Sequence, residues 1–531
     1  MKQLYIILAL CLSLNAYTLA QLQIKHQRTL GGYSDDYLQS LDLTTDGGTI
    51  IGGTSISIAS AEKSANNNGL QDYWLLLLNS EGKIKWDKTI GGNAEDYLRF
   101  VKQTRDGNYI LAGSSNSNIS GNKTQNCKGG FDFWIIKIDK NKNILWDKTI
   151  GGNCADFFSA AQETIDGGIL LAGYSCSNKS FDKTKNSRGG FDYWIVKIDK
   201  HGNVEWDNTI GGSDDDLLIS VASTKDGGFI LGGYSISGIS GEKTAICRGQ
   251  YDYWIVKISC TGKVEWDKTI GGSSWDYLKS VEQTSDGGYI VGGYTYSDKS
   301  GDKTENNKGY TDYWIVKLSR NGNIQWDKTL GGKGDDILTS IQQTADGYII
   351  GGSSFSNDLI GEPFNTPNNY NYLFTKIDIN GNLQWNKMFG GNNQDFLSCM
   401  MPTRKNYWIT GGSSLSGKTE DKDQKCRGGY DFWVTVMKCD AAGEIGSKES
   451  NTIIQNTNEN TFSVYPNPAN NWLYLKNRDD ETFALTDEWG KILMTKKING
   501  NGSINISALP AGIYYLKNLT TFKVKKVVIV R

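Results

Sequence analysis

Histidine, proline and long apolar runs are scarce in this chain of 531 residues. Its two histidines, His26 and His201, are far apart, so neither a histidine-rich metal site nor a Ser-His-Asp arrangement is expected. After the first twenty residues, no apolar run approaches the roughly eighteen residues that indicate a membrane-spanning helix. We therefore predict no transmembrane segment.

A block of basic charge is also missing. The 56 basic side chains are balanced by 58 acidic ones, which leaves no electrostatic footprint for nucleic acid. Glycine is abundant, with 63 residues, and the chain has 16 tryptophans and 27 tyrosines but only six prolines. Many short strands joined by glycine-containing turns give this composition, so the sequence predicts an all-β protein.

Residues 1–20 have the pattern of a signal peptide. Lys2 supplies the positive start, residues 4–14 are apolar, and Ala20 ends a plausible cleavage site. Export would permit disulfides among the eight remaining cysteines. Two pairings are open, Cys154 with Cys176 or Cys127 with Cys176, and we expect one or two disulfides at most.

A Gly-Gly pair recurs along residues 21–446. Its spacing is 60 residues five times and then 59, which indicates seven repeat units. The first glycines of the pairs are Gly31, Gly91, Gly151, Gly211, Gly271, Gly331 and Gly390.

Each unit contains four candidate strands. In unit five these are residues 277–284, 289–294, 312–318 and 323–330, bounded by Asp-Gly and Asn-Gly turns. The third candidate is apolar on both faces, as expected when sheets stack face to face. Unit seven lacks its fourth strand, but residues 24–32 match the missing segment. The repeats thus predict a seven-bladed β-propeller whose last blade is closed by an N-terminal strand.

The candidate ligand-binding residues lie just before the first strand of each unit. An aspartate ring at a channel mouth would suit a cation, sugar hydroxyls or basic peptide groups. Alternatively, each carboxylate accepts N–H groups of its own turn, and sevenfold repetition favours this second interpretation. Trp275 is unique to unit five and suits stacking on a sugar. The ring contains Asp36, Asp96, Asp156, Asp216, Asp276, Asp336 and Asp395.

The long loops of each unit carry basic residues in two registers. Lys123, Lys183, Lys243 and Lys303 share one of them, and such charges either hold an anionic glycan or form weak surface pairs. The loops lack the acidic spacing of a dedicated calcium loop, so no metal site and no cofactor are predicted, although calcium is left open.

The composition changes after residue 446. Residues 447–461 are polar and show no repeat, which indicates a linker. Residues 462–531 alternate strand and turn patterns and predict a small Ig-like β-sandwich. This segment contains several short, separate motifs. Their residues are Tyr465, Pro466, Asn467, Pro468, Gly490, Leu509, Pro510, Gly512, Tyr514, Lys525 and Lys526.

These motifs resemble the type A C-terminal sorting domain of the type IX secretion system of Bacteroidetes. The resemblance implies contact with the secretion machinery, export across the outer membrane, removal of the domain, and then surface anchoring or release. The repeat region is similar to uncharacterised Gly-Gly/Asp-Tyr-Trp repeat proteins, which carry no known catalytic residues.

Three functions stay open on the sequence. The first is a non-catalytic propeller, expected as a monomer, that binds a glycan or a surface protein through its long loops. The second is a carbohydrate-active hydrolase or lyase that uses carboxylates near the channel mouth, such as Asp35, Asp215 and Asp335. The third is a structural component of the cell surface. The few histidines and the repetition of the acidic residues favour binding, and no catalytic residue is assigned.

Overall fold

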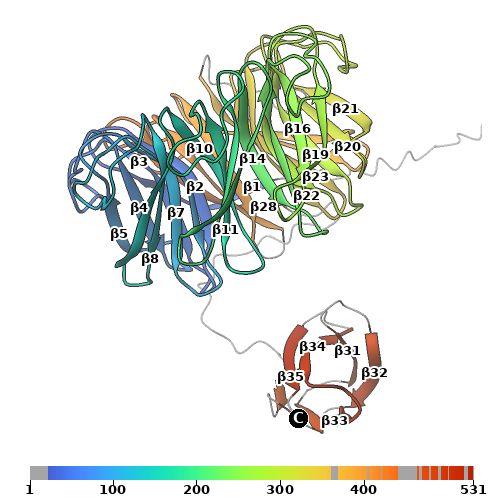
Figure 1. Cartoon of the computed structure of the whole chain (residues 1–531). Helices are drawn as coiled ribbons and strands as arrows, with labels where there is room; N and C mark the ends of the chain where they lie inside the picture. The colour runs from blue at the N-terminus through green and yellow to red at the C-terminus, as the bar shows by residue number, and fades with distance from the viewer. Residues whose placement is uncertain are drawn as a thin grey trace, which may run out of the picture. The chain divides into compact units, whose positions relative to one another are not determined.

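The computed structural model describes residues 22–359, 369–403, 406–419 and 421–439, and in the C-terminal part 463–465, 469, 471–476, 480–487, 492–499, 502–519 and 524–529 (Figure 1). The expected signal peptide (1–20) and linker (447–461) lie outside these residues. The chain divides into two compact units, residues 1–445 and 446–531, and each is described by itself.

Four-stranded antiparallel sheets repeat along the first unit. Six of them use consecutive strands, and together with a seventh they account for every strand described between residues 22 and 439. In chain order the six sheets are β2 (Asp36–Leu43), β3 (Thr49–Ser55), β4 (Asp72–Leu78) and β5 (Ile84–Ile90); β6 (Asp96–Gln103), β7 (Tyr109–Ser115), β8 (Asp132–Ile138) and β9 (Ile144–Ile150); β10 (Asp156–Glu163), β11 (Ile169–Ser175), β12 (Asp192–Ile198) and β13 (Val204–Ile210); β14 (Asp216–Ser223), β15 (Phe229–Ser235), β16 (Asp252–Ile258) and β17 (Val264–Ile270); β18 (Asp276–Gln283), β19 (Tyr289–Thr295), β20 (Asp312–Leu318) and β21 (Ile324–Leu330); and β22 (Asp336–Thr344), β23 (Gly347–Ser354), β24 (Asn371–Asp378) and β25 (Leu383–Phe389).

The seventh sheet joins the two ends of the repeat region. It has the order β1-β28-β27-β26, with β26 (Asp395–Pro402), β27 (Tyr407–Ser414), β28 (Asp431–Cys439) and β1 (Leu22–Leu30). Figure 1 shows the blue strand β1 beside the orange strand β28. The N-terminal segment therefore supplies the strand that unit seven lacks, as the sequence predicted.

Side-chain contacts show that β1 substitutes for a regular fourth strand. In five other sheets a buried tryptophan of the third strand donates its Nε1–H to an aspartate of the fourth, as Trp134 does to Asp147 at 3.0 Å. In the last sheet Trp433 donates to Gln27 of β1 at 2.9 Å. Gln27 thus provides the acceptor that the tryptophan requires when it is buried.

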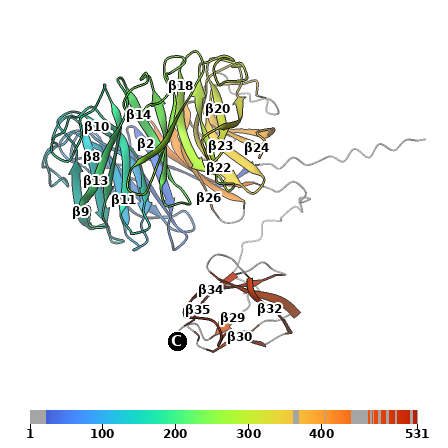
Figure 2. The same ribbon diagram turned by 45° about the vertical axis from the view of Figure 1, so that its right-hand side comes forward.

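The middle strands of each sheet are the most deeply buried elements. All seven residues of β8 and of β12 are buried, whereas β6 and β10 alternate buried and partly exposed positions. Strands that are covered on both faces by neighbouring sheets need apolar side chains on both faces. Consecutive sheets lie face to face around the unit (Figure 2), which explains the pattern.

The boundary between one sheet and the next, here called a junction, has the same construction throughout. The backbone N–H of the first residue of each sheet donates to a carbonyl of the preceding sheet at 2.6–2.8 Å. Aromatic rings stack across the junctions, for example Tyr73 on Trp134 with centroids 5.1 Å apart. The last sheet packs on the first in the same way, because Asp36 N donates to Tyr430 O at 2.6 Å and Trp74 lies 4.9 Å from Phe432.

The first register of long-loop lysines is buried, so the expectation of surface charges was wrong for Lys123 and its equivalents. Lys123 is only 2% exposed, and its ammonium group lies 5.1 Å from the centre of the Trp134 ring. Lys183 and Lys243 repeat this arrangement over Trp194 and Trp254. A desolvated cation over an indole face is a favourable contact, and it ties each long loop to the sheet below. The second register does form the expected ion pairs, as Arg188 does with Glu242 at 2.6 Å and Arg248 with Asp302 at 2.8 Å.

The second unit consists of two small sheets. One has the order β29-β30-β33 and the other β32-β31-β34-β35. Their facing side chains, among them Leu473, Phe483 and Leu516, form one buried cluster. The strands are β29 (Ser463–Tyr465), β30 (Trp472–Lys476), β31 (Asp480–Thr486), β32 (Ile492–Asn499), β33 (Gly502–Asn505), β34 (Gly512–Asn518) and β35 (Val524–Ile529).

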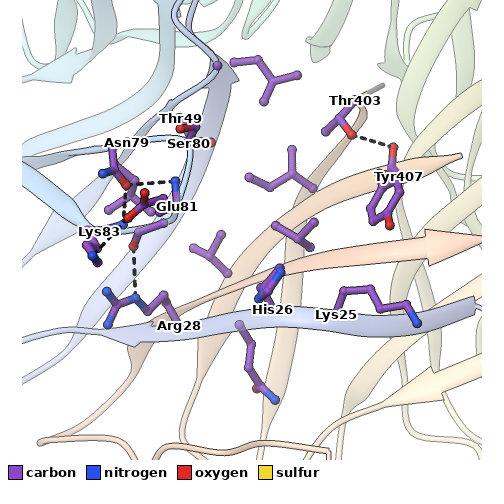
Figure 3. A pocket seen from close by; sticks show the side chains of 18 of the residues that line it. Lys25, His26, Arg28, Thr49, Asn79, Ser80, Glu81, Lys83, Thr403 and Tyr407 are labelled. Atoms are coloured by element: carbon purple, nitrogen blue, oxygen red, sulfur yellow. Dashed lines mark hydrogen bonds and ion pairs between the residues drawn. The ribbon is translucent and has the colours of Figure 1, made fainter. Parts of the chain in front are cut away.

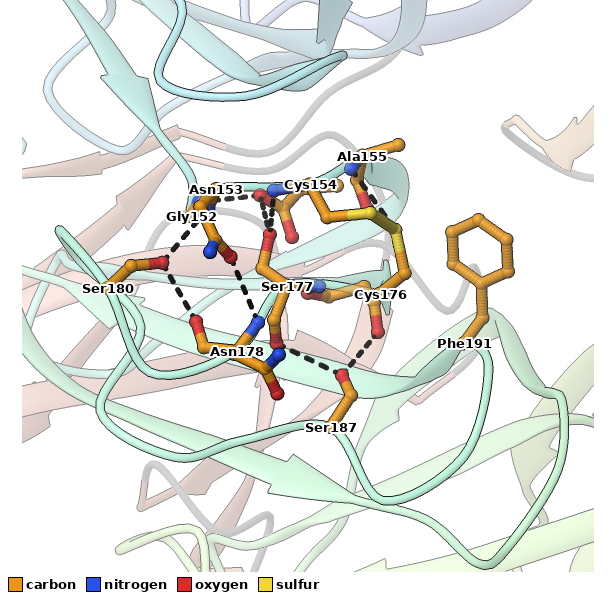
Figure 4. The surroundings of a disulfide bond; sticks show 12 residues. Gly152, Asn153, Cys154, Ala155, Cys176, Ser177, Asn178, Ser180, Ser187 and Phe191 are labelled. Carbon is orange, nitrogen blue, oxygen red and sulfur yellow. Dashed lines mark hydrogen bonds between the residues drawn. A yellow bond between two sulfur atoms is a disulfide. The ribbon is translucent and has the colours of Figure 1, made fainter.

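Cys154 and Cys176 form a disulfide, which settles the choice between the two predicted pairings (Figure 4). The bond ties the loop before β10 to the residue after β11, across a sequence separation of 22. Cys127, Cys247, Cys260, Cys399 and Cys426 are not in disulfides.

Replacing both Cys154 and Cys176 by serine should lower the free energy of unfolding by about 3 kcal/mol, because the crosslink restricts the unfolded chain. Denaturant titration with and without reductant would measure the change. The matched control is Cys260→Ser, an exposed cysteine whose loss should have no effect. Equal stability of the double variant and the wild type would contradict the expectation.

Candidate ligand-binding face

The aspartate ring is buried at the start of the first strand of every sheet. All seven carboxyl groups are 0% exposed. In each, Oδ2 accepts the N–H of the glycine four residues earlier, at 2.6–2.7 Å, and the hydroxyl of a serine on the following loop, at 2.9–3.2 Å. The ring therefore fixes its own turns, the second of the two interpretations, and a ligand cannot reach these carboxylates without unfolding the turn.

Buried carboxyl groups also meet in pairs at the junctions. A β-carbon on Gly331 would lie 1.9 Å from Asp312 Oδ1 and 2.5 Å from Asp336 Oδ2, so only glycine fits between the two carboxyl groups. Among the described residues, neither Asp312 Oδ1 nor Asp336 Oδ1 has a hydrogen-bond partner. Like-charge coupling joins the equivalent pairs, which are Asp72 with Asp96, Asp132 with Asp156, Asp192 with Asp216, Asp252 with Asp276, and Asp431 with Asp36.

These pairs hold a proton more tightly than isolated carboxylates. Burial raises the pKa of Asp336 to about 7, and the charge of Asp312 adds to the rise. Two desolvated carboxylates at close range resist ionising together, so each pair retains a proton to a higher pH than an isolated carboxylate does. The sixth unit supports this, because Asn371 occupies the register of Asp312 and an amide resembles a protonated carboxyl group.

Stability should accordingly rise on mild acidification. The pKa of these groups is higher in the folded than in the unfolded chain, so their contribution is full below about pH 4 and is lost as the pH rises through 6 to 7. We expect a melting temperature higher by about 5 °C at pH 5.5 than at pH 7.5. Turn residues with a lowered pKa, such as Asp226 with a pKa of about 2, stabilise the fold when ionised. Their contribution is lost only in stronger acid, so it does not oppose the rise expected at pH 5.5.

Asp312→Asn should flatten this pH profile, because the amide is permanently neutral. The control is Asp214→Asn at an exposed position. A melting temperature that falls between pH 7.5 and pH 5.5 in the wild type would refute the shared-proton description.

The end of the unit that carries these turns and the long loops, here called the long-loop face, is rich in half-buried aromatic rings. Some follow a ring aspartate and others lie in the long loops, and they contact one another within units and across junctions. One chain of contacts runs Tyr97–Phe131–Phe157–Phe191, and another runs Phe355–Tyr370–Phe396–Tyr430–Tyr37. The residues that follow the seven aspartates are Tyr37, Tyr97, Phe157, Leu217, Tyr277, Ile337 and Phe396.

The fifth unit adds two exposed rings that contact each other to this group of aromatic side chains, here called the aromatic belt. Trp275 is 42% exposed and Tyr296 is 46% exposed, and their rings meet edge to face with centroids 5.8 Å apart. Tyr277 and Tyr294 support the pair from below, with centroids 5.2 Å apart. The result is a rigid aromatic surface at one point of an otherwise repetitive face.

Polar groups flank the belt. Tyr370 donates its hydroxyl to Asp335 at 3.1 Å and Tyr251 donates to Asp215 at 3.4 Å. Asp335 and Asp215 stand in the register of Trp275, one residue before the ring aspartates, and both are partly exposed. Carboxylates with tyrosine partners can accept hydrogen bonds from sugar hydroxyls, while rings stack on apolar ligand faces.

The sequence analysis did not single out two cationic residues, Arg99 and Lys279, which lie on the first strands of their sheets. Arg99 donates to Gln39 at 3.0 Å, and the ammonium group of Lys279 lies 5.6 Å from the centre of the Tyr294 ring. Burial lowers the pKa of Lys279, and the like charge of Arg99 lowers it further. Their shared register, three residues after a ring aspartate, was the available signal.

The C-terminal motif residues lie on strands and turns of the second unit. Leu509 packs against its core, and Tyr514 donates its hydroxyl to Pro510 O at 3.0 Å. Tyr465 lies on β29, Gly512 begins β34, and Lys525 and Lys526 lie on β35. Pro466, Asn467, Pro468 and Gly490 fall outside the described residues.

Two negative findings apply to the part of the chain that the structure describes. No group of three or more histidine, cysteine, aspartate or glutamate side chains could hold a metal ion there. No helix in that part is long and apolar enough to cross a membrane.

Together these observations define an all-β repeat protein with propeller-like four-stranded sheets and a separate C-terminal β unit. Residues 463–530 match the family described as a secretion system C-terminal sorting domain, which confirms the resemblance drawn from the sequence. A domain of this kind implies secretion through a type IX system to the cell surface or the medium.

Other comparisons are less specific. No curated protein matches the chain. Among solved structures, hydrazine synthase of Kuenenia stuttgartiensis is 12% identical over 72% of this chain and 92% of its own, with a TM-score of 0.42. An apocarotenoid oxygenase of Synechocystis is 9% identical over 75% and 89%, with a TM-score of 0.38. Likenesses this distant carry no argument about function.

Proposed function

We propose that the first unit is a seven-bladed β-propeller closed by β1, and that the sorting domain is an Ig-like sandwich. The propeller is supported by the identical construction of the junctions, including the one between the last and the first sheet. The sandwich is supported by the core that its two sheets share. In this proposal export follows removal of residues 1–20 in a member of the Bacteroidetes, and the sorting domain is cut off near residues 447–461.

The exported propeller acts as a non-catalytic binding protein for a glycan on the long-loop face. The observation that carries this is the exposed pair Trp275 and Tyr296, because adjoining exposed aromatic rings on a rigid scaffold mark a binding site. Sugar rings offer C–H faces for stacking, and their hydroxyls suit the carboxylates of Asp215 and Asp335. The proposed ligand site thus moves from the buried aspartate ring to the aromatic belt.

Binding of the full chain to a panel of purified polysaccharides tests this function. Trp275→Ala should weaken binding roughly tenfold or more, equivalent to about 1.4 kcal/mol, because one stacking surface is lost. The matched control is Tyr310→Ala, which removes another exposed aromatic ring and should leave affinity unchanged. Equal binding by the wild type and Trp275→Ala would reject the site.

Product analysis of the same mixtures separates binding from catalysis. Intact polysaccharide supports the proposal. Newly released oligosaccharide would favour the carbohydrate-active alternative and direct attention to Asp35, Asp215 and Asp335. No binding to any polysaccharide would favour a protein ligand or a structural role.

Deletion of residues 462–531 should abolish export across the outer membrane, because the sorting domain supplies the export signal. The protein should then stay on the periplasmic side of that membrane. Fractionation of cells that express the deleted and the full chain measures this. The control is Lys517→Ala, a single change on β34 of the intact domain. Undiminished secretion of the deleted chain would contradict the assignment.

A further inference from the structure

A pocket of about 1030 Å³ lies at the junction between the last and the first sheet, on the side of the hairpin turns (Figure 3). One wall is β1, a second is the pair of turns that follow β2 and β4, and a third comes from β26, β27 and β28. Its volume is at the upper end of the range typical of small-molecule sites. Neither Trp275 nor Tyr296 of the long-loop face lines it.

The pocket exists because β1 carries His26 where the other fourth strands carry tryptophan. Elsewhere this tryptophan fills the junction: a β-carbon on Gly202 would meet Trp146 at 3.1 Å, and one on Gly262 would meet Trp206 at 2.6 Å. A β-carbon on the equivalent Gly82 would meet no described atom within 4 Å. The imidazole is smaller than the indole, so space remains between the sheets.

Two further small residues enlarge the space at this junction. Thr49 of β3 stands in the register of Tyr289 on β19 and Tyr348 on β23, which pack against Trp266 and Trp326. Val436 pairs with His26, whereas the equivalent partner of Trp326 is the longer side chain Lys317. The junction between the last and the first sheet thus has smaller side chains at three positions, His26, Thr49 and Val436. The junctions compared with it have larger side chains there, so the same volume is filled.

The chemistry of the pocket is mixed. Its walls are aliphatic, with Leu43, Leu78, Ile409, Val434 and Val436. Along β1 the rim is cationic: Arg28 donates only to the carbonyl of Gly82, at 3.1 Å, and Lys25 donates to Gln23 at 2.9 Å. Neither cation has an ion-pair partner among the described residues, and His26 lies between them (Figure 3).

The acidic residues of the rim are largely occupied. Asp46 pairs with Lys85 at 2.6 Å and Glu81 pairs with Lys83 at 3.0 Å. Asp423 is exposed, on a loop whose neighbouring residues Asp421 and Gln424 accept hydrogen bonds from β1. Lys25 and Arg28 remain without an acidic partner among the described residues, and the guanidinium group of Arg28 suits a carboxylate or sulfonate.

We propose that this closing-junction pocket binds a small organic anion with an apolar body, such as a medium-chain fatty acid or an aromatic acid. The apolar body occupies the aliphatic walls and the acidic group contacts Arg28 and His26. The proposal does not depend on glycan binding at the long-loop face.

Fluorescence titration of the full chain with 8-anilinonaphthalene-1-sulfonate, an apolar aromatic anion, tests the pocket. We expect saturable binding of one probe molecule per chain. His26→Trp restores the side chain found at the other junctions and should weaken binding at least tenfold while raising the melting temperature. Thr49→Tyr fills the same space from the opposite sheet and should act alike if the first variant fails to fold.

Charge is tested separately. Arg28→Gln should weaken probe binding about tenfold, whereas Lys328→Gln, at the same register of β21, should not change it. Decanoate should displace the probe and decylamine should not. Unchanged binding in both filled variants would overturn the pocket, and equal displacement by decylamine would overturn the anionic ligand.

Discussion

The junction between neighbouring sheets is the constraint on which the rest of the first unit depends. A buried aspartate begins each sheet; its N–H bonds to the preceding sheet and its carboxyl group fixes the turn above. Because the carboxyl groups are fully buried, the hydrogen bonds that they accept are required rather than optional. The sequence of a repeat can vary elsewhere, but these positions cannot easily change.

Residues that recur in every unit and residues that occur in one unit have different roles in this molecule. Residues that recur in register, such as the ring aspartates and the buried lysines over tryptophan, form the scaffold. The proposed sites depend on departures from the register: Trp275 adds an exposed ring at one unit, and His26 removes an indole at the closing junction. In an array of similar units, such exceptions provide the asymmetric surface that the proposed sites use.

Much of the fold could be predicted because strands follow local patterns. The four candidate strands of unit five agree with β18 to β21 within one residue at every end, and the match of residues 24–32 predicted the pairing of β1. The burial of Lys123 and of the aspartates could not be predicted, because charged residues are usually solvated and only the stacked sheets enclose them. The pocket also escaped prediction, since its walls come from residues more than 350 positions apart in sequence.

The sequence by itself determined the repeat, its strands, the closing segment and the export domain, since each depends on residues near one another along the chain. The tertiary structure alone decided which of two cysteine pairs forms, which carboxyl groups are withdrawn from solvent, and where the junctions leave space. These properties depend on distances between distant segments, and a periodic pattern does not encode the volume that a missing indole leaves behind.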